Sequence, residues 1–313
     1  MSQAAPTIPK PVPGVTLLDS RRERLQKIGT LVATVVPFAG FVTAVVTLWG
    51  RGLSMVDAGI FIVLYVFTGL GVTIGFHRLE THGAFKAKRP LRALFAIAGS
   101  MSLQGSVIDW VAAHRRHHAF SDQVGDPHSP HLAEEDTLRG ILKGLFHAHM
   151  GWLFGPEKTS HERWAPDLLK DPMIVKIDKA FPWLTLLSFV LPAALGLAIT
   201  RSWWGMVTAF LWGALGRIFL LHHVTWSVNS ICHFFGDRPF QSNDESTNNW
   251  MLSLLSFGES WHNNHHAFPT SAVHGIGKGQ VDISAAVIRG LERLRLVSNV
   301  KLPTPKQLAT KSK

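Results

Sequence analysis

The feature that most constrains the fold of this chain is a set of long apolar runs that carry almost no charge. The first, residues 28–49, contains about twenty consecutive residues without a charge, enough to cross a hydrocarbon layer roughly 30 Å thick. Further runs follow at 55–76, 181–200 and 203–225, and the connectors within each pair are short. The sequence therefore predicts an all-α integral membrane protein whose four transmembrane helices form two hairpins.

The charges fit this prediction. Charged residues make up only 17% of the chain, below the roughly 25% of an ordinary soluble protein. The net charge of +10 comes from basic residues in the N-terminal tail, the long middle loop and the C-terminal tail, whereas each hairpin connector has one. Basic loops face the cytoplasm, so we expect both termini and the middle loop there and no nucleic-acid partner.

The remaining segments complete the expected domain plan. Residues 91–111 are apolar but interrupted by polar side chains, which favours one interfacial or half-buried helix. Asp282 is placed to cap an amphipathic docking helix with Ile283, Val287, Leu291 and Leu294 on one face, followed by a tail. The plan is a cytoplasmic tail over 1–27, a main domain over 28–277, and a C-terminal helix and tail over 278–313.

The chain has 17 histidines but a single cysteine, Cys232. One cysteine excludes an internal disulfide, a four-cysteine iron–sulfur cluster and a cysteine-rich zinc site within this chain. A metal bound here must therefore be held by histidine, carboxylate or water.

Nine histidines lie in four segments that the predicted topology brings to the cytoplasmic ends of the two hairpins. They occur in HRLETH (residues 77–82), HRRHH (114–118), ICH (231–233) and HNNHH (262–266). In each HxxHH, the three rings share one helix face. The i, i+5 pair of HRLETH can converge only if its helix ends or bends. Nine imidazoles exceed what one ion binds, so the pattern predicts two metals in a cytoplasmic helical cap.

Several residues other than the nine histidines have more than one interpretation. Asn229 shares a helix face with His233 and either binds metal directly, holds a metal-bound water, or caps the helix; we favour the water. Glu259, Asp126 and Asp109 are either hydrogen-bond acceptors for ligand imidazoles or surface carboxylates. The other histidines have more ordinary interpretations as solvated or hydrogen-bonded residues.

A histidine-only, two-metal site at the bilayer suits first-row metals, with iron the natural choice if dioxygen takes part. Side-chain acids and bases do not break an unactivated C–H bond of a methylene chain, whereas a metal–oxygen oxidant does. The expected substrate is a lipid, and the expected outcome is either loss of two hydrogens or addition of a hydroxyl.

The strings HRLETH, HRRHH and HNNHH, with NSICHFFG before the last, resemble those of the membrane fatty acid desaturase family, specifically the bacterial Δ9 acyl-CoA (stearoyl-CoA-like) type. The resemblance covers the chain from about the first span to about Gly277. It implies a di-iron centre with Asn229 contacting one iron through water, and Gln104, Trp110 and Trp226 near the acyl tunnel. The implied metal ligands are His77, His82, His114, His117, His118, His233, His262, His265 and His266.

The resemblance also implies the reaction: an oxidoreductase that uses O₂ and places a cis double bond at Δ9 of a saturated C16 or C18 chain. No haem-binding HPGG and no fused cytochrome b5 domain are found, so electrons are expected from a separate donor: a ferredoxin, cytochrome b5 or a flavoprotein reductase. Acyl-CoA is favoured over acyl-lipid as substrate, with Arg139, Lys143 and Lys158 as candidate contacts to the CoA phosphates. The expected location is the bacterial plasma membrane.

Two rivals stay open from sequence. A hydroxylase of a lipid, alkane or carotenoid on the same scaffold would share the metals. A non-enzymatic membrane metal carrier or haem protein is disfavoured, because transport ligands lie within the spans near the midplane.

Overall fold

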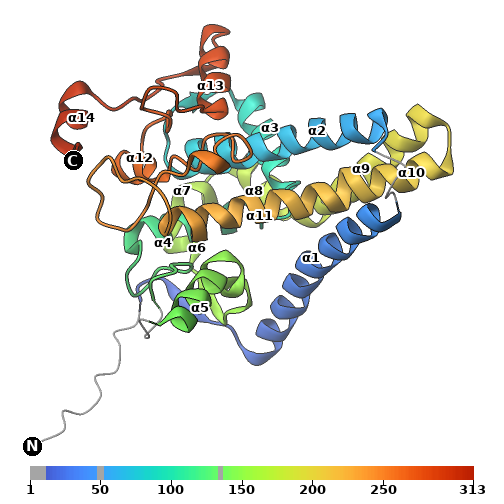
Figure 1. The fold of residues 1–313 in the computed structure, drawn as a ribbon, viewed down its shortest axis with the longest axis horizontal. Helices are drawn as coiled ribbons and strands as arrows, with labels where there is room; N and C mark the ends of the chain where they lie inside the picture. Colours follow the sequence, from blue (N-terminus) through green and yellow to red (C-terminus); the bar gives the residue numbers. More distant parts are fainter. Residues whose placement is uncertain (1–11, 48–52, 133–136) are drawn as a thin grey trace, which may run out of the picture.

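The computed structural model describes residues 12–47, 53–132 and 137–313, and it is mostly helical (Figure 1). The expected tail before residue 12, the end of the first predicted span at 48–49 and the connector carrying Arg51 lie outside the described residues. Among the described residues, four helical segments are long and apolar enough to cross a membrane: Ser20–Val46, Met55–Thr81, Phe181–Thr200 and Trp203–His233.

Each of these segments is built from labelled helices that follow one another. The first is α1 (Ser20–Thr47), which starts upstream of the span boundary expected at residue 28. The second joins α2 (Met55–Leu70) to the π-helix η1 (Gly71–Thr81), and the third is α9 (Phe181–Thr200). The fourth runs through α10 (Trp203–Ala209), the π-helix η3 (Phe210–Gly216), α11 (Arg217–Ser230) and the short η4 (Ile231–His233).

The smaller elements lie mainly at the end of the molecule where α4, α5 and α12 are seen in Figure 1. The helices between the second and third spans are α3 (Arg89–Ser100), α4 (Val107–Phe120), α5 (Leu138–His149), η2 (Gly151–Phe154), α6 (His161–Trp164), α7 (Pro166–Leu169) and α8 (Pro172–Lys179). After the fourth span come η5 (Trp250–Leu252), α12 (His262–Ala267), α13 (Ile283–Arg293) and α14 (Pro305–Lys311).

Two small antiparallel sheets pair segments that are far apart in the sequence. In the first, β1 (Val15–Leu17) pairs with β3 (Glu157–Thr159), with Thr16 opposite Lys158. In the second, β2 (Lys86–Ala87) pairs with β4 (Val297–Ser298). The N-terminal segment is thereby held against the middle of the chain, and the C-terminal segment against the region that follows η1.

Buried polar side chains join the long helices. Asp57 in the first turn of α2 accepts a hydrogen bond from Thr208 of α10 at 3.0 Å. Arg217 of α11 is buried and donates to Ser188 of α9 at 2.6 Å and to the Met101 carbonyl at 3.3 Å. An unpaired polar group costs most in a low-dielectric interior, so these bonds fix how the apolar helices pack.

The apolar stretch 91–111 forms two helices rather than the single one expected. The break lies at 101–106, where Leu103 and Gly105 both adopt positive φ values of 62° and 105°. An α-helix cannot continue through left-handed backbone, so α3 ends and α4 starts in a new direction. The segment is also more deeply placed than expected, because Phe95, Ala96 and Val107 belong to the buried core.

The C-terminal prediction is correct in part. Asp282 caps α13 by accepting from the Ala285 amide at 2.8 Å. As expected, Ile283, Val287 and Leu291 are partly buried against the core, beside the fully buried Ile288. Leu294, which follows the end of α13 at Arg293, is the exception and is 69% exposed. The expected tail contains a further helix, α14, whose start is closed by a capping box between Thr304 and Gln307.

Candidate metal centre and acyl cavity

Histidines from four distant segments meet at one end of the long helices. Two sets of ring nitrogens lie close enough to hold a metal ion, all within 4.8 Å of one another in each set. The first set, called group A here, contains His77, His82, His114, His118 and His265. The second, group B, contains His117, His233, His262 and His266. Together these are the nine histidines that the sequence singled out.

The i, i+5 pair of group A converges because its helix is a π-helix. The His82 amide donates to the His77 carbonyl at 3.2 Å, which is the i→i+5 bond that defines this form. Each turn then takes in more residues than an α-turn, so His82 returns to the side of the helix that carries His77. The expected end is present as well, since η1 ends at Thr81 and Gly83 follows with a φ of 53°, but the sequence did not indicate the π-helix before it.

Within each group, the Nε2 atoms face one another. In group A, His77 and His265 are 3.0 Å apart through these atoms, and His265 and His118 are 2.9 Å apart. In group B, His262 lies 3.1 Å from both His233 and His266. Nitrogens bound at right angles to one ion at about 2.0–2.1 Å would be separated by about 3 Å. The spacing is therefore that of neighbouring ligands on a shared ion.

Four of these rings donate a hydrogen bond to a carboxylate from Nδ1, the ring nitrogen on the side away from the facing Nε2 atoms. The Nδ1 atom of His117 donates to Asp126 at 2.9 Å, that of His233 to Asp122 at 2.8 Å, and that of His266 to Asp244 at 2.6 Å. His77 donates in the same way to Glu259, which also accepts from Arg78. A carboxylate on Nδ1 fixes the tautomer and orientation of a metal-binding imidazole and makes it more basic.

These hydrogen bonds explain why the residues fit metal ions. A neutral imidazole has one N–H, and where Nδ1 gives it to a carboxylate, Nε2 has only a lone pair. In group B, His233 and His266 therefore both direct lone pairs into the same space. Without a cation, such an arrangement would be repulsive and poorly hydrogen-bonded, whereas a bound ion would satisfy it.

For several site residues outside the membrane-spanning helices, the pKa shifts favour neutral rings and charged carboxylates. Burial lowers the pKa of His118, His262 and His265, and the neighbouring imidazoles lower it further. Burial alone would raise the pKa of Asp126 and Asp244, but the hydrogen bonds that they accept, from His117 and His266 respectively among others, lower it overall. The carboxylates are thus anionic acceptors, which suits neutral imidazole ligands.

Two further histidines adjoin the groups. His274 is buried, its ring centroid lies 4.5 Å from that of His265, and both of its nitrogens lack a hydrogen-bond partner among the described residues. His128 lies 4.3 Å from His117 between ring centroids, with Asp126 close to both. Sequence spacing gave no signal for His274, since it stands alone eight residues after the HNNHH string.

Of the three carboxylates that the sequence suggested as acceptors for ligand imidazoles, two have this role and one does not. Glu259 and Asp126 accept from site imidazoles, whereas Asp109 accepts instead from His161, at 2.6 Å. Asp122 and Asp244 are acceptors that the sequence reasoning missed. Asp122 could have been predicted from the sequence, because it follows His118, the last residue of HRRHH, by four residues.

A cavity of about 850 Å³ adjoins both groups. Its walls are mainly apolar and come from α1, α4, α9 and α11, while His77 and His114 of group A and His262 of group B line its inner part. An apolar molecule in this cavity would lie beside both histidine groups.

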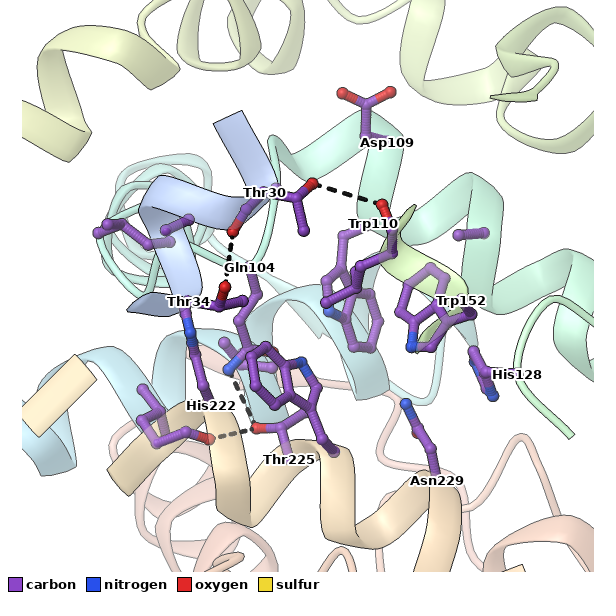
Figure 2. Close-up of a pocket in the computed structure, with 18 of the residues that line it drawn as sticks. Thr30, Thr34, Gln104, Asp109, Trp110, His128, Trp152, His222, Thr225 and Asn229 are labelled. Atoms are coloured by element: carbon purple, nitrogen blue, oxygen red, sulfur yellow. Dashed lines mark hydrogen bonds between the residues drawn. The ribbon is translucent and has the colours of Figure 1, made fainter. Parts of the chain in front are cut away.

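The residues expected near an acyl tunnel line this cavity (Figure 2). Gln104 donates to Thr225 of α11 at 3.0 Å, so this bond ties the α3–α4 connection to the fourth span. The Trp110 ring stacks on His114 with centroids 4.8 Å apart, and the Trp226 ring is tilted against that of His222 with centroids 4.9 Å apart. Asn229, one turn before His233 on the same helix, also faces the cavity.

Fold and site together define a class: a helical, membrane-type protein with a two-part histidine site beside an apolar cavity. The Fatty acid desaturase family model matches residues 53–285, a span that contains both histidine groups. The chain therefore belongs to the fatty acid desaturase family, whose members are oxidoreductases of lipid metabolism.

Relatives across this family resemble the chain over most of its length. A hex-5-enoyl-[acyl-carrier protein] acetylenase of Moorena producens is 42% identical over 95% of this chain and 92% of its own. An sn-1 stearoyl-lipid 9-desaturase of Anabaena variabilis is 38% identical over 81% of this chain and 87% of its own. An acyl-CoA C20 Delta5-desaturase of Anemone leveillei is 38% identical over 77% and 72%, respectively.

Proposed function

We propose that this protein is an O₂-dependent fatty acyl desaturase that places a cis double bond, at Δ9, in saturated C16 or C18 chains. The observation that carries the proposal is the cavity, since it is lined by histidines of both groups and otherwise mainly by apolar walls. A methylene chain lying there would pass next to both metal positions. The stearoyl-lipid 9-desaturase relative supports the Δ9 position.

Two iron ions, one in each histidine group, would supply the redox chemistry with dioxygen that side chains lack. Overall, one saturated CH₂–CH₂ unit, one O₂, two electrons and two protons give one CH=CH unit and two waters. The chain's own residues bind and orient the substrate. The hydrogen bond between Gln104 and Thr225 places a polar group in the cavity wall. Trp110 and Trp226 confine the methylene chain, and Asn229 holds a water beside group B.

The electrons come from a separate donor, of the ferredoxin, cytochrome b5 or flavoprotein type. We propose further that the four apolar helices cross the bacterial plasma membrane as two hairpins. The histidine groups form a cap on the cytoplasmic side, where both termini and the basic loops also lie. The distribution of lysine and arginine supports this orientation.

The test is expression in a host whose membrane lipids are mostly saturated, with a co-expressed electron donor, followed by double-bond location in the fatty acid esters. Active protein gives new C16:1 or C18:1 at Δ9. His265→Ala removes a group A nitrogen and should abolish the product, whereas His147→Ala, outside both groups, should retain it.

Other products would reassign the activity. A mass gain of one oxygen on the acyl chain would identify a hydroxylase. A triple bond formed from an unsaturated chain, with saturated chains untouched, would identify an acetylenase like the Moorena relative. No product despite metal loading, membrane insertion and a competent donor would contradict the proposal.

A further inference from the structure

One face of α1 forms a wall of the cavity. The lining residues of α1 run from Arg22 to Pro37 and fall on one broad side of the helix, about 200° wide at 100° per residue. Gln26, Thr30 and Thr34 give this face a polar character near the start of the helix (Figure 2). The cavity therefore extends along the first candidate membrane span, over a rise of about 20 Å.

This wall is held near its start by hydrogen bonds, and farther along by packing against the fourth span, where Phe41 stacks on Phe219 with ring centroids 4.7 Å apart. Near its start, Gln26 and Thr30 donate to the carbonyls of Gly155 and Leu153, each at 3.3 Å. Further along, Gly40 lies so close to Leu215 that an added Cβ would be only 2.2 Å from its Cδ1. Only 17% of the most apolar 18-residue stretch of this helical segment is buried.

The cavity reaches the outside along this flank. Val32 and Val36 line the cavity, yet their side chains are 54% and 44% exposed. On a helix of 3.6 residues per turn, both lie on the same edge of the cavity-facing side. Val35 is 50% exposed but lies on the opposite side and does not line the cavity. Because α1 is apolar enough to span a bilayer, this edge opens toward lipid.

The charged residues of the cavity lining are largely committed to partners. Arg22 pairs with Asp19 at 3.3 Å, Asp109 with His161 at 2.6 Å, and Glu157 with Arg116 at 2.5 Å. Among the described residues, Lys158 is a lining cation with no ion pair within 4 Å, and Arg139 and Lys143 on α5 do not line the described part of the cavity. Coenzyme A carries several phosphate groups and needs several free cations. A glycerolipid head group, neutral or with one phosphate, does not.

We propose that the substrate is an acyl chain still esterified to a membrane glycerolipid, and that the chain enters sideways from the bilayer across the Val32–Val36 edge of α1. This inference rests on the desaturase function proposed above. It replaces acyl-CoA, which the sequence favoured, as the carrier. The ester end then lies near Arg22 and Lys158, and the methylene chain passes the two histidine groups.

The test uses the iron-loaded, full-length protein in vesicles of palmitoyl-oleoyl-phosphatidylglycerol, with a reductase and ferredoxin as donor. Conversion of the palmitoyl chain of the lipid is compared with that of added palmitoyl-CoA and palmitoyl-acyl carrier protein. We expect the lipid chain to react and the two soluble esters to react at least about tenfold more slowly.

Tryptophan substitutions then test the route. Val36→Trp, or Val32→Trp if the first variant is unstable, fills the edge and should slow desaturation of the lipid at least about tenfold, while Val35→Trp stays within about twofold of the unchanged protein. A second readout is independent of activity. A phosphatidylglycerol with a photoreactive group in its acyl chain should label cavity peptides in the unchanged protein and in Val35→Trp, but not in Val36→Trp.

The outcomes separate the two proposals. Reaction of the lipid with no difference between Val36→Trp and Val35→Trp overturns the lateral route. Faster reaction of palmitoyl-CoA or of the acyl carrier protein ester overturns the glycerolipid as substrate, with desaturation retained. Absence of a double bond in every carrier overturns the proposed function itself.

Discussion

At the scale of single residues, the carboxylates behind the imidazoles decide how well the site holds metal. Glu259 accepts from Nδ1 of His77 through one oxygen and from Arg78 through the other. Arg78 is fully buried and also pairs with Asp282 at 3.0 Å. His77 is therefore oriented by a network whose far end is the residue that caps α13.

Glu259→Gln keeps the shape of the side chain but removes its charge. We expect iron affinity to fall by about 10–100-fold, as for other acceptors behind metal-bound imidazoles. The measurement is iron content by elemental analysis across a chelator titration. Glu292→Gln on the exposed side of α13 serves as the matched control. Equal iron affinity in the two variants would mean that Glu259 has only a structural role.

At the scale of elements, the π-helix η1 is what makes an i, i+5 histidine pair usable. It packs against α3 with its backbone in close contact, because a Cβ added at Gly71 would be 2.2 Å from the Gly99 amide nitrogen. A backbone atom cannot move aside as a flexible side chain does. Glycine is thus required at the point where α2 becomes η1.

Gly71→Ala should consequently separate η1 from α3. We expect a loss of about 1–3 kcal/mol in stability, as for other overpacked sites, together with a reduced iron content because His77 and His82 shift. Gly59→Ala in α2 meets nothing within 4 Å and should be neutral or stabilising by up to about 1 kcal/mol. Thermal unfolding in detergent, followed by metal analysis, compares the two. A Gly71→Ala protein as stable and as rich in iron as Gly59→Ala would refute the packing argument.

The same elements show which features could be predicted from the sequence and which could not. The spans and the HxxHH clusters were predictable, because charge-free length and i, i+3, i+4 spacing are local properties. The turn between α3 and α4 was not, since Leu103 takes a left-handed conformation that leucine has no intrinsic tendency to adopt. Asp244 and His274 reach the site only through the tertiary fold, so their positions in sequence carried little information.

At the scale of the whole molecule, the histidine groups join segments that are otherwise far apart in the chain. Group A links η1, α4 and α12, and group B links α4, η4 and α12. The C-terminal segment is fastened to the same region, because Lys311 beyond α13 donates to the Ala267 carbonyl at the end of α12, at 2.7 Å. Metal ions in both groups would therefore act as cross-links between these segments.

Because the unfolded chain has no such arrangement of nitrogens, metal binding should stabilise the folded state through linkage. With free ferrous ion about a thousandfold above its Kd, the gain is about 4 kcal/mol for each bound ion, on the order of 10 °C in Tm per ion for a chain of this size. Chelation should reverse the gain, and readdition of iron should restore it. Zinc should also raise Tm, since imidazole binds both metals, but it should not restore desaturation because it has no redox chemistry. The double variant His262→Ala/His265→Ala, which removes one nitrogen from each group, should show a much smaller rise with either metal. If the unchanged protein and this variant respond equally to iron, the stabilising ions bind elsewhere and the two-group metal centre is wrong.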